Sequence, residues 1–205
     1  MTHHQRRLYV FVNGVLSDPA AIDWTDRAVA WVHGHTLDHA DKYEYWTWAL
    51  TRRLTQGKHA QALAQLVNLH SEPNDLVLVG HSNGCDLLLR ALPWIRERVH
   101  VLHLLSAAAE PDFDTNGLND LLRRNRVQWV VVWRAGQDQA LRLAWWSRLL
   151  TLGLAGYGGL GIDGPRNVAR ELAYAVLPLD EPCYGHSDWF AEGPAFERTM
   201  ERITA

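Results

Sequence analysis

The sequence predicts an α/β protein with a mostly parallel central sheet of about six strands and helices on both of its faces. Two observations carry this prediction: short Val- and Leu-rich runs alternate with helical apolar spacing, and several runs are apolar at every position. A strand without polar alternation is buried on both faces, which is typical of parallel sheets. We expect residues 1–205 to form one domain, because the chain contains no repeat, linker or low-complexity segment.

The first part of the chain supplies three of the expected strands. A β-rich run that ends at a Gly-containing pair is typical of a strand followed by a tight loop. The helical stretch between the second and third strands contains a glycine, where we expect a break. In chain order the expected elements are strand 8–12 before Asn13-Gly14, strand 28–32 before His33-Gly34, helical stretch 43–69 with Gly57, and strand 76–79.

The second part continues the same alternation and completes the expected sheet. Proline marks the end of one helix and the beginning of another, as its missing N–H requires. The expected elements are helix 85–92 before Pro93, strands 99–105 and 127–133, a long apolar helix at about 140–152, a glycine-rich loop 153–164, strand 172–177 and a helix after Pro194.

Charge and composition exclude several classes of function. The formal net charge is −3 and no Lys/Arg-rich run is present, so we expect no nucleic-acid partner. Lysine occurs only as Lys42 and Lys58, which leaves few candidates for Schiff-base chemistry. The amino-terminal segment has no apolar core of a signal peptide, and no apolar run is long enough to span a bilayer. We therefore expect a cytoplasmic protein without stable membrane insertion.

No cofactor or metal site is expected from the motifs. Residues 156–161 match G-x-G-x-x-G, but they follow a helical stretch, and Gly164-Pro165 stands where a dinucleotide-binding helix would run. The two cysteines, Cys85 and Cys183, form no zinc pattern and no disulfide framework. Two separate reduced thiols are the expected state in the cytoplasm, although a catalytic arrangement of the chain could bring them near each other.

The segment Gly80-His81-Ser82-Asn83-Gly84 is the strongest chemical signal in the sequence. It matches G-x-S-x-G, and a buried strand precedes it while a helix follows it. This context is that of a nucleophile elbow, in which a sharp turn exposes a serine hydroxyl. The flanking glycines fit, because the turn leaves no room for side chains there. We therefore predict Ser82 as a nucleophile.

An elbow predicts an acid and then a histidine further along the chain, each beyond the end of a strand. Asp138 follows strand 127–133, and His186 follows the last expected strand. In the predicted triad His186 accepts the proton of Ser82, and Asp138 fixes the tautomer of the imidazole. Asp112 is the reserve acid, ahead of Glu110 and Asp114. The predicted oxyanion hole combines the backbone N–H of Asn83 with that of Val15, for which Gly14 is the rival.

These segments together resemble the α/β-hydrolase superfamily along most of the chain. The resemblance implies a serine esterase, lipase, thioesterase or amidase that uses an acyl-enzyme, has no cofactor and acts on a small-molecule acyl substrate. Two departures from the family are visible: Asn13-Gly14 replaces the frequent His-Gly, and residues 106–127 are too few for a large cap domain. Within this class a carboxylesterase or lipase-like activity on small to medium apolar acyl groups is the preferred prediction.

Two other functions compete with this one. The fold could serve as a catalytically inactive binding module, although all the triad residue types are present in the expected order. Residues 33–39 resemble the H-x-H-x-D-H signature of dinuclear metallohydrolases, which makes His33, His35, Asp38 and His39 candidate ligands. An extra residue between His35 and Asp38 puts this motif out of register. The substrate, the oligomeric state and the role of residues 141–164 as a lid stay open.

Overall fold

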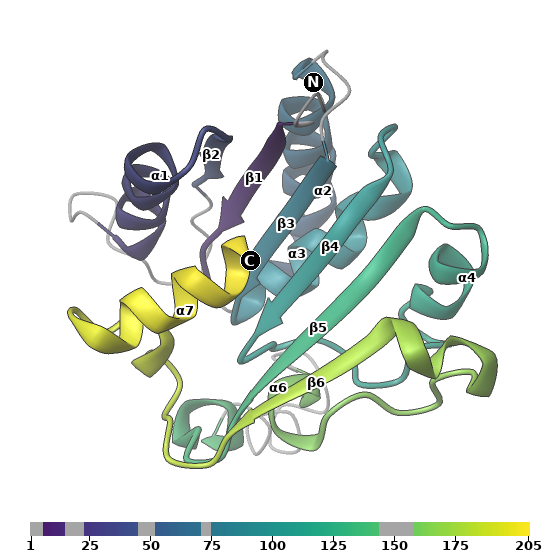
Figure 1. The fold of residues 1–205 in the computed structure, drawn as a ribbon. Coiled ribbons are helices and arrows are strands. Elements are labelled where there is room, and N and C mark those ends of the chain that lie inside the picture. Colours follow the sequence, from purple (N-terminus) through teal and green to yellow (C-terminus); the bar gives the residue numbers. More distant parts are fainter. Residues whose placement is uncertain (1–5, 15–22, 45–51, 71–74, 144–157) are drawn as a thin grey trace.

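Six parallel strands form one sheet in the order β2-β1-β3-β4-β5-β6 (Figure 1). The computed structural model describes residues 6–14, 23–44, 52–70, 75–143 and 158–205. The predicted, mostly parallel sheet of about six strands is confirmed, and every pairing among these strands is parallel. The strands are β1 (Arg7–Val12), β2 (His39–Tyr43), β3 (Asp75–His81), β4 (Val99–Leu105), β5 (Val127–Ala135) and β6 (Val176–Glu181).

Helices cover both faces of this sheet, as predicted. The described helices are α1 (Trp24–His35), α2 (Arg52–Leu69), α3 (Asn83–Ala91), α4 (Leu118–Arg123), α6 (Leu160–Asp163) and α7 (Pro194–Thr204). Buried side chains of α1 and α7 pack together on one face, and those of α2, α3, α4 and α6 pack on the other. Within the described part of the chain, no helix has both the length and the apolar character needed to cross a membrane.

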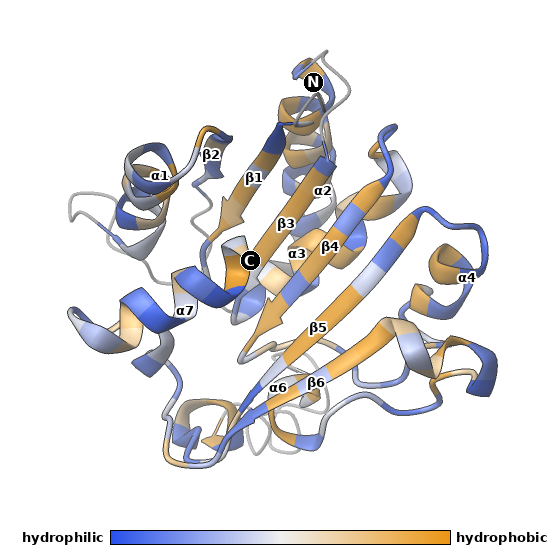
Figure 2. Cartoon of the chain, viewed as in Figure 1, coloured by the Kyte–Doolittle hydropathy of each residue, from blue (hydrophilic) through white to orange (hydrophobic). Residues whose placement is uncertain are grey.

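The alternation of side chains along β1 explains why two helical layers are needed. Tyr9 and Phe11 point into the cluster beneath α1 and α7, whereas Leu8, Val10 and Val12 point into the opposite cluster. All five side chains are buried. The strand is therefore apolar on both faces, and Figure 2 shows the same hydrophobic character along β3. Burial of both faces supplies most of the favourable free energy that holds such a sheet together.

The expected strand at residues 28–32 is wrong, because this segment lies within helix α1. Asp23 is its N-cap, with a carboxylate that accepts the backbone N–H of Thr25 at 2.7 Å, and a capping box with Asp26 is complete. The buried residues Trp24, Ala28 and Val32 are four apart, which is the spacing of one helix face. The second strand along the chain is instead β2, a polar edge strand.

Three further boundaries differ from the prediction. The stretch from residue 43 is not helical at first, since Tyr43 ends β2, and α2 then continues through Gly57 without a break. The last strand begins at Val176 rather than at residue 172, because residues 170–175 form a 3₁₀ helix. Most of the expected helix 140–152 and part of the loop 153–164 lie outside the described residues.

Candidate active site

Ser82 occupies the junction between β3 and α3 in a strained backbone conformation. Its φ and ψ angles are 55° and −123°, a region that non-glycine residues rarely adopt. Two backbone hydrogen bonds hold it there: Ser82 N–H donates to the Leu105 carbonyl, and Ala108 N–H donates to the Ser82 carbonyl, both at 3.0 Å. The Ser82 hydroxyl does not cap α3. The local geometry is that of the predicted elbow.

The two flanking glycines are required by close packing. A Cβ on Gly80 would lie 3.0 Å from the backbone nitrogen of Cys85 in α3, which cannot rotate away, and 2.7 Å from Cδ1 of Leu88 in the same helix. At Gly84 a Cβ would lie 2.5 Å from the Val12 carbonyl oxygen and even closer to that of Asn13. Helix α3 therefore begins directly against the end of β1, and the elbow and the loop after β1 are in contact.

The loop after β1 begins beside the candidate nucleophile. A Cβ on Gly14 would lie 2.9 Å from Cβ of Ser82 and 3.3 Å from its Oγ. Asn83 is the first residue of α3, where helix geometry directs backbone N–H groups toward the amino-terminal end. Val15, the predicted second oxyanion donor, lies outside the described residues. Its rival Gly14 is described and lies against Ser82.

Asp138 and His186 come together in one hydrogen bond. Nδ1 of His186 is 2.8 Å from Oδ2 of Asp138, whose side chain is fully buried. The other oxygen of Asp138 accepts the backbone N–H of Leu141 at 2.8 Å. Since a carboxylate accepts, Nδ1 of His186 carries the proton, which leaves Nε2 as the acceptor. The imidazole is 21% exposed, so it is accessible to a small molecule.

Adjacent strand ends explain why these two residues meet. The loops after β5 and β6 are joined by backbone bonds from Gly136 N–H to the Glu181 carbonyl, at 3.0 Å, and from Gln137 N–H to the Tyr184 carbonyl, at 2.9 Å. A Cβ on Gly136 would lie 2.5 Å from the Pro182 carbonyl oxygen, so the loops approach too closely for a side chain.

The reserve acid is engaged elsewhere. Asp112 accepts the backbone N–H groups of Asp114 and Thr115, both at 2.9 Å, and thereby shapes its own turn. These hydrogen bonds lower the pKa of Asp112, with the bond from Thr115 as the largest cause. Asp138 is thus the carboxylate that contacts His186.

His81, which the motif treats as a variable position, links the elbow to His186. Its Nε2 donates to the backbone carbonyl of His186 at 2.8 Å, and the two rings are 4.8 Å apart. Trp24 and Phe190 contact the same imidazole edge to face. Burial lowers the pKa of His81 to about 4, so its ring is neutral at pH 7. This link was not predicted from the sequence, because only the choice of histidine at the variable position of the motif could have indicated it.

The candidate metal ligands of residues 33–39 have separate partners. His33 accepts the backbone N–H of Ala40, His35 contacts the Trp31 carbonyl, Asp38 accepts the N–H of Arg7, and His39 lies beside Arg6. Among the residues that the structure describes, no group of three His, Cys, Asp or Glu side chains could hold a metal ion. The structure therefore gives the metallohydrolase reading no support.

The two cysteines are both free thiols. Cys85 is buried beneath the elbow, with Sγ 3.6 Å from the Leu105 carbonyl oxygen, and burial raises its pKa. Cys183 is exposed. A buried thiol with a raised pKa is a poor nucleophile, so Cys85 serves as a core residue.

Comparisons with known proteins give a consistent picture of the fold. No protein-family model and no curated protein matches the sequence. Similar solved structures include α/β-hydrolase domain-containing protein 10 from mouse, with a TM-score of 0.57 and 18% identity, covering 96% of this chain and 88% of that one. Methylesterase MES16 from Arabidopsis has a TM-score of 0.55 and 12% identity, covering 96% and 98%.

A third solved structure, described as a predicted CIB-like hydrolase from Thermoplasma acidophilum, has a TM-score of 0.53 and 16% identity, covering 100% of this chain and 87% of that one. Coverage of nearly the whole chain in all three cases means that the likeness extends beyond the elbow to the complete sheet. Together with the parallel sheet and the strand–serine–helix junction, these likenesses identify the architecture: the chain has the α/β-hydrolase fold.

Proposed function

We propose that this protein is a serine hydrolase that cleaves carboxylic esters through an acyl-enzyme intermediate. One observation supports the proposal most strongly: His186 is paired with Asp138, and its backbone carbonyl accepts a hydrogen bond from His81, the residue directly before the strained Ser82. In support of this proposal, Ser82, Asp138 and His186 follow the carboxyl ends of β3, β5 and β6, the end at which open α/β sheets bind their ligands.

The chemistry follows from the groups at this edge. Ser82 Oγ attacks the ester carbonyl carbon while Nε2 of His186 takes its proton. The imidazolium that forms is stabilised by the carboxylate of Asp138, whose hydrogen bond to Nδ1 also fixes the tautomer. His186 then gives the proton to the departing alkoxide, and the acyl group stays on Ser82. Water attacks in the second half with His186 again as the base.

The negative charge on the carbonyl oxygen needs preorganised donors during both halves. We assign one donor to the N–H of Asn83, at the amino-terminal end of α3, and the other to the loop after β1. For the second donor the candidates are Val15 and Gly14, and the contact of Gly14 with Ser82 supports this loop as its source. Removal of one such donor typically costs about 100- to 1,000-fold in kcat.

The substrate class comes from the neighbours and the sequence together. Two of the similar solved structures are an esterase and a methylesterase, and another is a thioesterase. Trp- and Leu-rich segments of this chain favour an apolar acyl group of small to medium size. We therefore propose a carboxylesterase or lipase-like preference, with a thioester as the variant to be tested in parallel.

The test is hydrolysis of p-nitrophenyl esters of increasing acyl length by the wild type, Ser82→Ala and Asp138→Asn, with folding checked by circular dichroism. We expect both folded variants to lose roughly 10³-fold or more in kcat, since residues of a triad act as a unit. Thioesters of the same acyl groups distinguish the two substrate classes.

A fluorophosphonate probe separates the alternatives. Labelling of the wild type, absent in Ser82→Ala, supports an activated serine even where the chosen esters are poor substrates. Equal hydrolysis by wild type and Ser82→Ala would exclude Ser82 as the nucleophile. A folded wild type that neither labels nor hydrolyses any ester would support the inactive binding module instead.

A further inference from the structure

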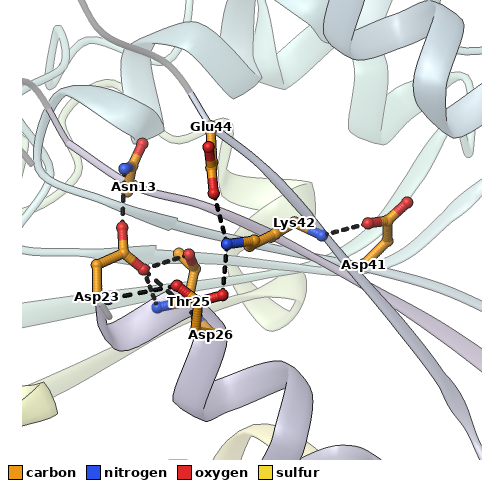
Figure 3. Close-up of polar contacts among 7 residues, drawn as sticks. All are labelled: Asn13, Asp23, Thr25, Asp26, Asp41, Lys42 and Glu44. Carbon is orange, nitrogen blue, oxygen red and sulfur yellow. Dashed lines mark hydrogen bonds and ion pairs between the residues drawn. The ribbon is translucent and has the colours of Figure 1, made fainter. Parts of the chain in front are cut away.

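One hydrogen bond joins the two ends of the loop that follows β1. Asn13 comes directly after β1, and Asp23 is the N-cap of α1. Nδ2 of Asn13 donates to Oδ2 of Asp23 at 3.0 Å, although the residues are ten apart in sequence (Figure 3). The end of β1 and the beginning of α1 are therefore held together by this side-chain contact.

Asn13 stands between this hydrogen bond and the elbow. Its carbonyl oxygen lies so close to Gly84 that no side chain fits there, and the next residue, Gly14, contacts Ser82. The backbone at Asn13 and Gly14 thus packs on the candidate nucleophile, while the side chain of Asn13 reaches in the direction of α1. A shift of the amide would move the backbone that faces Ser82.

Contacts within the first turn of α1 hold Asp23 in place. Its Oδ1 accepts the N–H of Thr25 at 2.7 Å and also contacts the Thr25 hydroxyl, while the carboxylate of Asp26 accepts the N–H of Asp23 at 3.3 Å. Lys42, at the end of β2, pairs with Asp26 and Glu44 (Figure 3). The two oxygens of Asp23 therefore serve two purposes: Oδ1 caps the helix and Oδ2 binds Asn13.

The burial of Asn13 argues against a purely space-filling side chain. It is 3% exposed, and its Oδ1 is buried and accepts no hydrogen bond from the described residues. An apolar residue would fill the same volume without leaving a buried acceptor unpaired. The hydrogen bond from Nδ2 to Asp23 therefore explains why an amide, rather than an apolar side chain, stands at this position.

We propose that Asn13 and Asp23 form a clamp that positions the backbone of Asn13 and Gly14 beside Ser82, with the N–H of Gly14 as the oxyanion donor that it holds in place. Both are positioning residues, because they act through the backbone and do not contact the reacting atoms. Oxyanion donors stabilise the transition state only when they are held in place before the reaction, so a loosened clamp lowers kcat. The inference rests on the proposed function, since it assigns a role within the same site.

The first test removes each half of the clamp. Asn13→Ala deletes the donor, whereas Asp23→Ser keeps an N-cap oxygen but is too short to reach Asn13. We expect each variant to lose about 10- to 100-fold in kcat, the size that small misplacements near a site produce, with KM changed less than about twofold. The double variant should lose no more than either single one, because both disrupt the same contact.

The second test rebuilds the clamp with the groups exchanged. Asn13→Asp sets two carboxylates against each other and should lower kcat. As pH is lowered and one carboxylate is protonated, its kcat relative to that of the wild type at the same pH should recover in part. Adding Asp23→Asn restores a donor–acceptor pair in reverse orientation and should restore most of the lost kcat. A side chain with only a space-filling role would give no such recovery.

Thr36→Val is the matched control. It removes a hydroxyl bonded to the Val32 carbonyl at the opposite end of α1, so it should lower the melting temperature without changing kcat. The clamp is overturned if Asn13→Ala and Asp23→Ser keep wild-type kcat, or if Thr36→Val loses as much kcat as they do. A wild type that neither hydrolyses esters nor reacts with fluorophosphonate rejects the proposed function itself, which separates the two failures.

Discussion

At the scale of single residues, His81 makes a contact that the G-x-S-x-G motif did not predict. Its hydrogen bond to the His186 carbonyl crosses from the elbow to the loop after β6. Because the acceptor is a carbonyl oxygen, Nε2 of His81 must carry the proton, and its neutral ring adds no positive charge beside His186. His81 therefore positions the candidate base without competing for its proton.

Replacing His81 tests this role. His81→Phe keeps an aromatic ring between Trp24 and Phe190 but loses the donor to His186, so we expect kcat to fall roughly tenfold through misplacement of the imidazole. His81→Gln retains an N–H donor and should lose less. Steady-state kinetics on the best ester gives both values, and a folded His81→Phe with wild-type kcat would contradict the role.

The candidate catalytic residues were predictable because each follows a strand with a recognisable pattern. Gly80 and Gly84 mark Ser82, and Asp138 and His186 occur in the expected order. The meeting of Asp138 with His186 depends on β5 and β6 being neighbours in the sheet, which the structure shows and the strand patterns alone did not predict. Their assignment to catalysis stays a prediction until Ser82 is tested.

At the scale of elements, the predicted strand at residues 28–32 differs most from the structure, because this segment is part of helix α1. The run Ala28 to Val32 is apolar enough for either structure, and periodicity in five residues does not separate them. The decisive signal was Asp23 with Asp26, three residues apart, which is a capping box just before the apolar positions. Edge strand β2 was missed because its polar side chains give no apolar run.

The contact between α3 and β1 yields a second prediction. In Gly84→Ala the new Cβ meets backbone oxygens of Val12 and Asn13, which cannot rotate away, so we expect a loss of about 1–3 kcal/mol in the free energy of unfolding. Displacement of Asn13 should lower kcat as well. Urea unfolding followed by circular dichroism, together with ester kinetics, measures both effects.

Gly57→Ala provides the control for this variant. Gly57 is an exposed residue of α2, and no atom lies within 4 Å of a Cβ added there. The change should stabilise the protein by about 0.5–1 kcal/mol, since glycine is a poor helix former. If Gly84→Ala instead left the free energy of unfolding unchanged while Gly57→Ala lowered it, the packing at the elbow would be looser than the structure shows.

At the scale of the whole molecule, two neutral histidines buried in the fold couple stability to pH. Burial lowers the pKa of His103 to about 3 and that of His81 to about 4. Nε1 of Trp133 donates to Nδ1 of His103 at 3.1 Å, so the neutral ring is the form that the fold accommodates. In the unfolded chain both imidazoles have a pKa of about 6.5.

The sign of the pH effect follows from proton counts. Below pH 6.5 the unfolded chain binds protons at both histidines while the folded protein does not, so the free energy of unfolding falls as pH is lowered. Between pH 7 and pH 5 each histidine should cost about 2 kcal/mol. His103→Gln keeps an acceptor for Trp133 and should recover its share, measured by denaturant unfolding at both pH values. The same loss in wild type and variant would contradict this account.

The sequence by itself determined the parallel sheet with helices on both faces, and it selected the strand–serine–helix junction. These features follow from local patterns: apolar runs, glycine beside serine, and proline at helix boundaries. The tertiary structure decided what those patterns leave undetermined. The bonds from Asn13 to Asp23 and from His81 to His186 join residues far apart in sequence. Such pairs depend on which strand ends become neighbours, and only the folded sheet fixes that.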